Sequence, residues 1–358
     1  MKSGETSPPP VADAGPSALR RRLLAWYDTA ARSLPWRAGP GSGSRTDPYF
    51  VWLSEVMLQQ TTVPHATPYF LTFTTRWPTV SDLAAAEDAE VMAAWAGLGY
   101  YARARNLLKC ARAVAAEHGG RFPGTEAELL ALPGVGPYTA AAVSAIAFDQ
   151  PANVVDGNVE RVMSRLFAVE TPLPDARGEL RARAAGFIDA ASDRHGDWAQ
   201  ALMDLGATVC RPGVPDCGAC PLAKGCAARA GSTPERYPLK LRKAPRPHRH
   251  GVAFVALRDG AVALVRRPER GLLGGMLALP TSDWRDRPWS PAELASTAPA
   301  AADWCLAGSV EHVFTHFSLT LDVYVGEAEV PGAEWRAVSE AATGLPSVFA
   351  KALQRGLA

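Results

Sequence analysis

The segment 132–161 joins a glycine-rich turn to an isolated carboxylate. Gly134 and Gly136 precede an apolar run, residues 139–148, that predicts a short helix, and Asp156 follows. Glycine lets a backbone turn tightly and approach a partner, and the unpaired N–H groups that open a helix suit a phosphate. Backbone N–H groups that bind phosphate hold DNA without recognising its base sequence. An isolated acid that follows such a turn closely indicates chemistry on a nucleotide. The same residues also fit a plain turn and a helix that Asp156 caps, so both interpretations stay open.

A second acid, Glu55, lies in a segment that predicts a helix. Within residues 47–63, Asp47 can cap a helix, Pro48 fits the first helical position, and apolar residues recur at helical spacing. Burial of the face around Glu55 would raise the pKa of its carboxyl and let it hold a proton near neutral pH. Periodicity leaves open the alternative that Glu55 emerges at the surface. The residues three and four positions away are mostly apolar: Val51, Trp52, Leu58 and Gln59.

Four of the six cysteines follow the spacing C-x6-C-x2-C-x5-C within one short stretch. Four thiolates in one loop can surround a metal centre, and the spacing alone fits either zinc or an iron–sulfur cluster. Because the other two cysteines stand alone, the pattern differs from a secreted disulfide scaffold, and we expect a reducing, cytoplasmic setting. The four clustered residues are Cys210, Cys217, Cys220 and Cys226.

The helices and strands that must position these groups are expected to form two domains, because a chain of 358 residues is too long for a single core. Residues 1–18 are rich in Pro, Ser, Gly and Ala and predict a disordered tail. Residues 19–230 show helical periodicity broken by Pro and Gly, and residues 231–250 predict a basic, proline-rich linker. Residues 251–358 predict a small α+β domain.

The expected second domain opens with two apolar runs that flank an Asp259-Gly260 pair, which predicts a β-hairpin. The whole chain carries a net charge of only +1, which by itself argues weakly against a nucleic-acid binder. Positive charge is local instead, with no acid between Arg236 and His250. No apolar run approaches the ~18 residues of a membrane span, so no membrane partner is expected.

Several motifs together resemble one family of DNA repair enzymes. LPGVGPYTA (132–140) resembles the helix-hairpin-helix of base-excision DNA glycosylases, and VVDGNVER (154–161) resembles the segment with their catalytic aspartate. LPWR (34–37) followed by SEVMLQQT (54–61) is similar to the adenine DNA glycosylases of the MutY type. The resemblance covers roughly residues 19–350. It implies a mainly α catalytic domain of the helix-hairpin-helix glycosylase fold, followed by an α+β domain like that of the Nudix hydrolases.

The resemblance assigns roles to the acids and the cysteines. It implies that Glu55 protonates adenine at N7 and that Asp156, as a carboxylate, stabilises the positively charged sugar. Tyr138 and Asn158 match residues that support this site by hydrogen bonding. The cysteine spacing resembles the [4Fe–4S] loop (210–226) of the endonuclease III and MutY enzymes, in which the cluster holds a loop and does not excise the base.

A base inside a duplex must be flipped out before it can be cleaved, and the resemblance implies which residues receive it. Residues matching the family's adenine pocket are Arg32, Leu34 and Trp36, although plain core packing of Leu34 or Trp36 is an open alternative. Residues matching those that wedge into the base stack and contact the opposite base are Gln60, Thr61, Leu98 and Tyr100.

Tyr138 also limits the expected reaction. Bifunctional lyases of the superfamily carry a lysine at this position, and its amine attacks the sugar as a Schiff-base nucleophile. A tyrosine cannot form that imine. We therefore expect base removal with little or no cleavage of the strand.

The end of the chain resembles the lesion-reading domain of MutY-type enzymes. Phe314, Thr315 and His316 match residues that recognise 8-oxoguanine opposite adenine, with Thr315 where the family often has serine. The clustered glutamates of a Nudix box are missing after GLLGG (271–275). We therefore expect no nucleotide hydrolysis by this domain.

The resemblance thus implies a glycosylase that excises adenine paired with 8-oxoguanine or guanine in double-stranded DNA, and we expect it to be a monomer. Three alternative functions compete with this one. The first is a glycosylase of the same fold for another base, such as thymine in a T:G mispair. The second is a non-catalytic DNA-damage binding module, and the third is a Nudix-type hydrolase fused to a helical domain.

Overall fold

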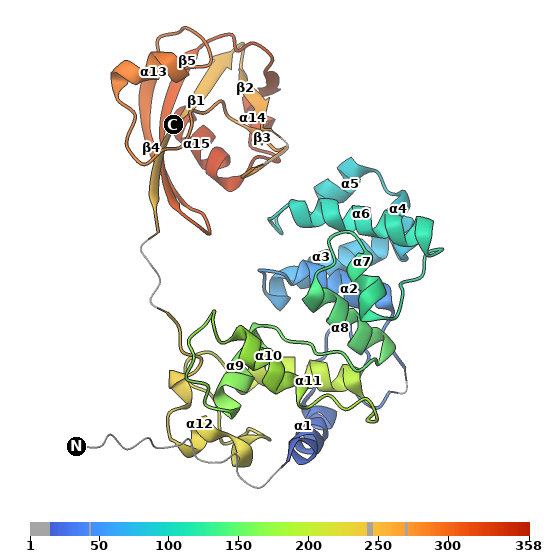
Figure 1. Cartoon of the computed structure of the whole chain (residues 1–358). Coiled ribbons are helices and arrows are strands. Elements are labelled where there is room, and N and C mark those ends of the chain that lie inside the picture. The colour runs from blue at the N-terminus through green and yellow to red at the C-terminus, as the bar shows by residue number, and fades with distance from the viewer. Residues whose placement is uncertain (1–14, 43, 242–245, 269–270) are drawn as a thin grey trace, which may run out of the picture. The chain divides into compact units, whose positions relative to one another are not determined.

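The computed structural model forms two compact units, Met1–Arg242 and Lys243–Ala358 (Figure 1). The described residues are 15–42, 44–241, 246–268 and 271–358. Most of the tail expected over residues 1–18 therefore lies outside the described residues, and Pro16 already begins the first helix.

The first unit is helical, as the sequence predicts. Its α-helices are α1 (Pro16–Ala30), α2 (Pro48–Met57), α3 (Val63–Arg76), α4 (Val80–Ala85), α5 (Asp88–Ala94), α6 (Ala102–Glu117), α7 (Glu126–Ala131), α8 (Pro137–Phe148), α9 (Gly157–Leu166), α10 (Arg177–Ala185), α11 (His195–Thr208) and α12 (Ala227–Ala230). Two short 3-10 helices cover Ala223–Gly225 and Pro234–Arg236.

Helix α2 starts where its residues predict. The Asp47 carboxylate accepts a hydrogen bond of 2.8 Å from the backbone N–H of Tyr49, and Pro48 occupies the first helical position. The helix ends at Met57, and α3 begins at Val63. The predicted Asp47 cap is confirmed, and residues 58–62 form a turn between the two helices.

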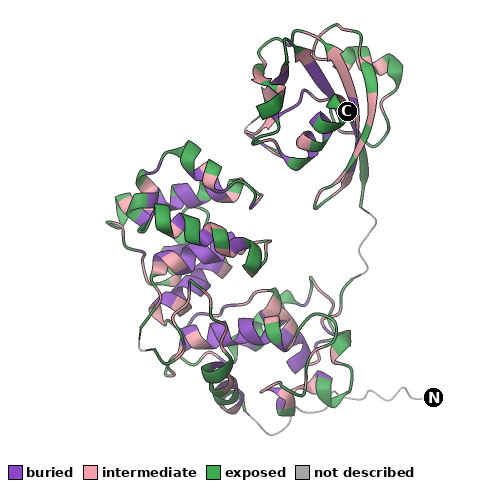
Figure 2. Cartoon of the chain, turned by 180° about the vertical axis from the view of Figure 1, so that it is seen from behind, coloured by how far each residue is buried: buried purple, intermediate pink, exposed green. Residues whose placement is uncertain are grey.

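Helix α8 lies at the centre of the unit and is buried along almost its whole length (Figure 2). Its Val143 and Ala147 face a core shared with α2, whereas Ala141 and Ala145 pack with Ala199 of α11. A helix that is apolar all round must be covered on all sides. Two cores therefore meet at α8, which explains the apolar run that the sequence shows there.

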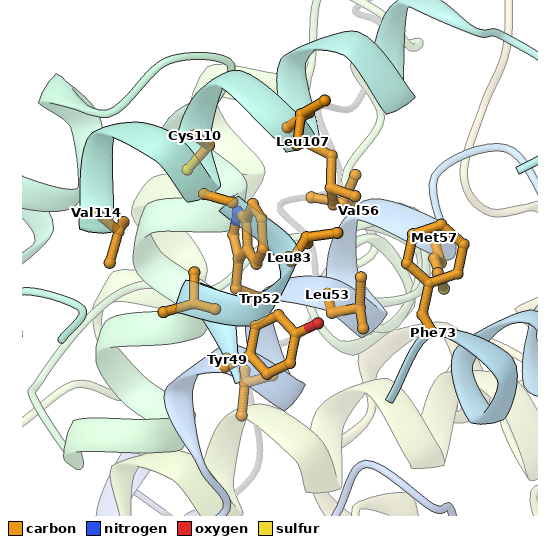
Figure 3. Close-up of a cluster of buried hydrophobic side chains, with 14 of the residues drawn as sticks. Tyr49, Trp52, Leu53, Val56, Met57, Phe73, Leu83, Leu107, Cys110 and Val114 are labelled. Carbon is orange, nitrogen blue, oxygen red and sulfur yellow. The ribbon is translucent and has the colours of Figure 1, made fainter. Parts of the chain in front are cut away.

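The larger core gathers aromatic and aliphatic side chains around α2 (Figure 3). Trp52 and Leu53 of α2 are at most 1 % exposed and belong to one cluster with Leu83 of α4 and Leu107 of α6. The second core joins α1, α9, α10 and α11. Helices from both cores border the site described below.

The connection to the second unit is shorter than the linker expected over residues 231–250. Tyr237 is buried against the first unit, and Leu173 donates a backbone hydrogen bond of 2.8 Å to Leu239. His248 already belongs to the first strand of the next unit. Residues 242–245 lie outside the described part of the chain.

The second unit is an α+β domain, as predicted, built on a six-stranded sheet with the order β3-β2-β1-β5-β4 and β6 paired to β2. Strands β1 and β5 are parallel, while β1 and β2 form the predicted hairpin through Asp259 and Gly260, whose φ angles are 49° and 75°. The elements are β1 (His248–Arg258), β2 (Ala261–Arg266), β3 (Leu277–Ala278), α13 (Pro291–Thr297), β4 (Cys305–Val313), β5 (Ser318–Glu327), β6 (Glu334–Ala337), α14 (Val338–Ala341) and α15 (Ser347–Leu357).

Among the described residues, no helix has both the length and the apolar character needed to cross a membrane.

Candidate active site

A cavity of about 320 Å³ in the first unit brings the two predicted acids to one place. Glu55 reaches it from α2 and Tyr138 from the first turn of α8. Asp156 and Asn158 reach it from the start of α9. A volume of this size is within the range of pockets that hold small organic groups.

Glu55 is buried, with 8 % of its surface exposed, and its Oε2 accepts a hydrogen bond of 2.7 Å from the Tyr138 hydroxyl. Burial raises the pKa of Glu55 above its ordinary value, and the negative charge of Asp156 acts in the same direction. The Tyr138 hydrogen bond and the positive charge of Arg37 oppose this rise in pKa. Burial also holds the pKa of Tyr138 well above its usual range, so the phenol remains a donor. The alternative of a surface glutamate is excluded.

Asp156 both caps a helix and faces the cavity. Its Oδ1 accepts a hydrogen bond of 2.7 Å from the backbone N–H of Val159, and its Oδ2 accepts one of 2.8 Å from the Asn158 amide. A negative charge is favoured at a helix N-terminus. Asp156 therefore caps α9 and lines the cavity at the same time, so its capping role does not exclude a role in the site.

Asn158 is fixed from behind by Arg161. The Arg161 guanidinium donates to Asn158 Oδ1 at 2.9 Å and to the backbone carbonyls of Cys210 and Gly206 at 2.8 and 2.7 Å. Helix α11 approaches α9 closely here, because a Cβ on Gly206 would lie 2.5 Å from the Asn158 Cβ. Packing thus leaves the Asn158 side chain little freedom beside Asp156.

An ion cluster that the sequence did not reveal borders the same cavity. Asp204 of α11 is completely buried and accepts bonds of 2.6 Å from the Arg32 guanidinium and 2.8 Å from the Arg37 guanidinium. Its other oxygen accepts the Arg32 backbone N–H at 2.9 Å. The one available signal was a lone acid inside the apolar stretch ALMDLGA (201–207). Such an acid must be paired when it is buried.

The walls of the cavity include the predicted pocket residues Arg32, Leu34 and Trp36. Trp36 is only 3 % exposed and makes an edge-to-face contact with Phe70, with ring centroids 5.2 Å apart. Trp36 is therefore core and cavity wall at once. Lining residues that the sequence did not point to are Arg37, Leu58, Gln59, Val63, Met203 and Ala207.

The four predicted wedge residues do not share one environment. Gln60 and Tyr100 are exposed and adopt left-handed backbone conformations, with φ of 58° and 50°. Thr61 lines the cavity. Leu98 is 5 % exposed and belongs to the larger core, so its side chain lies apart from the exposed pair.

The predicted hairpin is the turn between α7 and α8. Gly134 has a φ of 73°, and a Cβ there would lie 2.7 Å from the Cβ of Asn106, so the turn requires glycine. Gly136 caps α8 and accepts the hydrogen bond from the Ala140 N–H. The amides of Tyr138 and Thr139 precede this bond and have no acceptor within the helix. The grip of this hairpin on a DNA phosphate stays a prediction.

The four clustered cysteines line one hollow in the first unit. Arg165 of α9 holds the loop, because its guanidinium donates to the backbone carbonyls of Arg211 and Gly213 and approaches Cys210 Sγ to 3.4 Å. All of these thiols are free. No three His, Cys, Asp or Glu side chains in the described part of the chain converge closely enough to hold a single metal ion.

The predicted lesion readers lie on the turn between β4 and β5 of the second unit. Thr315 and His316 are exposed at its tip, which is closed by a 2.9 Å backbone bond from Phe314 to Phe317. Phe314 is half-buried and stacks on Trp284, with centroids 5.5 Å apart. Phe314 and Phe317 both pack against the core of this unit.

Comparisons with known families match both units. Residues 53–184 match the family described as HhH-GPD superfamily base excision DNA repair protein, and residues 252–355 match the NUDIX domain. A solved structure of a thermostable thymine-DNA glycosylase is 30 % identical with a TM-score of 0.53, covering 60 % of this chain and 97 % of its own. The expected fold class is confirmed.

Curated relatives extend the match over nearly the whole chain. The adenine DNA glycosylase of Homo sapiens is 34 % identical, across 95 % of this chain and 74 % of its own length. That of Mycolicibacterium smegmatis is 42 % identical across 56 % of this chain and 66 % of its own. The chain belongs to the adenine DNA glycosylases, DNA repair enzymes of the base excision class that hydrolyse the N-glycosidic bond.

Proposed function

We propose that this protein excises adenine paired with 8-oxoguanine or guanine in double-stranded DNA and leaves the strand intact. The observation that carries the proposal is one cavity in which a buried acid and a capped carboxylate occur together. Burial raises the pKa of Glu55, so that it can carry a proton, while Asp156 accepts two N–H donors as a carboxylate. Cleavage of a glycosidic bond uses one carboxyl group of each kind.

The reaction follows from this pair. The adenine is flipped into the cavity, and protonated Glu55 donates its proton to N7 of the base. The bond between the sugar C1′ and N9 then breaks, and its electrons leave with the base. The Asp156 carboxylate stabilises the positive sugar that remains. Water adds to C1′ and returns a proton to the Glu55 carboxylate, which regenerates the acid.

Single-turnover assays test this function directly. Duplexes with adenine opposite 8-oxoguanine, guanine, cytosine or thymine are incubated with excess protein, heated in alkali and resolved by strand length. We expect cleavage at the adenine strand for the first two duplexes. Glu55→Gln is expected to bind the same DNA and release almost no adenine. Near-normal release by this variant would break the assignment.

A thymine glycosylase acting on T:G mispairs is the second candidate, supported by the structural match to a thymine-DNA glycosylase. The buried Glu55 favours adenine, because a purine offers the basic N7 that a general acid can protonate. Including a T:G duplex in the same assay separates the two functions. Release of thymine but not of adenine would favour the second candidate.

Strand cleavage is not part of the proposal because Tyr138 offers a phenol and no amine. The phenol is already engaged with Glu55 and lies 3.5 Å from Met203 Sδ. Borohydride traps an imine between an enzyme and its opened sugar. A stoichiometric trapped adduct with DNA would contradict the proposal.

A [4Fe–4S] cluster on Cys210, Cys217, Cys220 and Cys226 is part of the proposal. Its support is that four free thiols line one hollow and that Arg165 holds the loop around them. All-thiolate donor sets suit iron–sulfur clusters. Bound there, the cluster would tie the loop together. Iron and sulfide analysis of purified protein tests this, and zinc alone without visible absorbance would contradict it.

Recognition of 8-oxoguanine by Thr315 and His316 completes the proposal. Its support is their exposure together at the tip of one tight turn. Thr315→Val removes a hydroxyl at nearly constant shape and should lower the preference for 8-oxoguanine over guanine opposite adenine. The matched control is Thr343→Val, at another exposed threonine of the same unit. An unchanged preference in Thr315→Val and in His316→Ala would remove this role.

A further inference from the structure

One arginine outside the cavity binds an unusual number of backbone carbonyls. Arg103 is the second residue of α6, and its guanidinium donates to the carbonyls of Val56, Met57 and Gln59 at 2.9, 3.2 and 2.6 Å. The other terminal nitrogen donates to Leu98 and Gly99 at 2.9 and 3.2 Å. Two chain segments that lie about 40 residues apart in the sequence are thus joined through one side chain.

The first group of carbonyls belongs to the end of α2 and the turn that follows it. The C-terminal end of a helix leaves carbonyls without partners and carries a partial negative charge. Arg103 donates hydrogen bonds to such carbonyls and brings a positive charge to them. Glu55 directly precedes Val56 on this helix. The second group of carbonyls belongs to the loop 97–101, where the Trp95 indole N–H also donates to Gly99 at 3.1 Å.

Each segment carries one of the two exposed residues with left-handed backbones. Gln60 follows the carbonyl of Gln59, and Tyr100 follows that of Gly99. Positive φ is uncommon for residues other than glycine and persists only where the surroundings impose it. The Arg103 guanidinium also lies over the rings of Trp95 and Tyr100, at 5.3 and 5.6 Å. It therefore fixes both the backbone and the side-chain plane beside the exposed pair.

The position of Arg103 gives its own helix no benefit. A cation in the first turn of a helix is opposed by the helix dipole. Burial also lowers the pKa of Arg103, which shows the cost of desolvating it. Only a planar fork with several donors can reach two groups of carbonyls together, and the compact ammonium of lysine cannot.

We propose that Arg103 is a positioning residue that holds Gln60 and Tyr100 as one rigid pair for insertion into mispaired DNA. The inference rests on the proposed function, since it concerns how that DNA is engaged. A pre-ordered pair saves the entropy of ordering two loops on the duplex. The ordering matters only where bases are unstacked, so it should affect mispaired DNA more than matched DNA.

Arg103→Lys tests this, with Arg112→Lys as the matched control. Arg112 lies on the same helix and also donates to backbone carbonyls, those of Ala84 and Ala86, away from both segments. Affinities are measured for duplexes with uncleavable 2′-fluoro-adenosine opposite 8-oxoguanine, and for matched duplexes. We expect Arg103→Lys to lower the ratio of the two affinities about tenfold or more and Arg112→Lys to lower it less than twofold. The fluorescence of a 2-aminopurine placed beside the mispair should also rise less on binding of Arg103→Lys, because this variant unstacks the neighbouring bases less.

A double-mutant cycle with Tyr100→Ala separates positioning from general stability. If Arg103 works through Tyr100, the second substitution adds little once the first is made. The proposal would be overturned if the losses of affinity ratio in the two single variants multiplied in the double variant. It would also be overturned if Arg103→Lys lowered the unfolding temperature and left the affinity ratio unchanged. Arg103→Gln is assayed in parallel, and failure of both variants to fold would assign Arg103 to the fold instead. Absence of adenine release by the unaltered protein would contradict the proposed function and not this inference.

Discussion

The hydroxyl of Tyr138 donates a 2.7 Å hydrogen bond to Glu55, a residue 83 positions earlier in the chain. The bond joins the first turn of α8 to the last turn of α2, two helices that pack against each other. Burial raises the pKa of Glu55, and this bond opposes the rise. Tyr138 therefore adjusts the pH range over which Glu55 carries the proton that it donates in the proposed reaction.

Tyr138→Phe should move the alkaline limit of activity to higher pH. The substitution removes the hydrogen bond that lowers the pKa of Glu55, so the carboxyl keeps its proton to a higher pH. In the proposed reaction, activity depends on protonated Glu55 and falls as pH rises through this pKa. The measurement is the single-turnover rate of adenine release between about pH 5 and pH 10. Tyr49→Phe is the control, since the buried Tyr49 hydroxyl donates to the Trp77 carbonyl and not to Glu55. If the alkaline limb of the pH–rate profile moved to lower pH in Tyr138→Phe, this account would be contradicted.

Asp156→Asn should separate catalysis from helix capping. Asparagine caps helices about as well as aspartate, so the free energy of unfolding should change by less than about 1 kcal/mol. The negative charge is lost, and we expect adenine release to slow by roughly a thousandfold or more. Rates come from single-turnover assays and stabilities from urea unfolding. Asp47→Asn makes the same change at the cap of α2, away from the cavity, and should keep its rate.

Much of this architecture could be predicted from the sequence because it depends on local patterns. The cap at Asp47, the apolar helix after Gly136 and the Asp259-Gly260 hairpin are each determined by neighbouring residues. The roles of Glu55 and Asp156 came from family motifs, since no local pattern places two acids 101 positions apart in one cavity.

The features that the sequence did not reveal depend on tertiary packing. Asp204 acquires its partners only when α11 lies beside the segment 32–37. Leu98 has a sequence context like that of its exposed neighbour Tyr100, yet the core of the unit takes up its side chain. The five carbonyl partners of Arg103 come from segments that only the fold brings together.

Asp204→Ala should destabilise the protein by about 3 kcal/mol or more, because it leaves Arg37 and Arg32 without their shared buried anion. Urea unfolding measures the difference. Asp28→Ala is the matched control, since Asp28 pairs with Arg194 but both side chains are partly exposed to solvent, at 44 % and 32 %. Exposed pairs are worth less than about 1 kcal/mol. Equal losses in the two variants would show that burial does not set the cost at Asp204.

Gly206→Ala should harm both stability and catalysis through Asn158. The new Cβ would lie 2.5 Å from the Asn158 Cβ and 3.2 Å from its backbone, so α9 and α11 must move apart. Such overpacking costs about 1–3 kcal/mol, and the displaced Asn158 would lose its bond to Asp156. Gly178→Ala is the control, because nothing lies within 4 Å of a Cβ there and α10 should gain up to about 1 kcal/mol. Unfolding curves of both variants measure the change in stability, and single-turnover rates measure the change in adenine release. A Gly206→Ala protein with a normal rate of adenine release would show that catalysis does not depend on the close contact between these two helices.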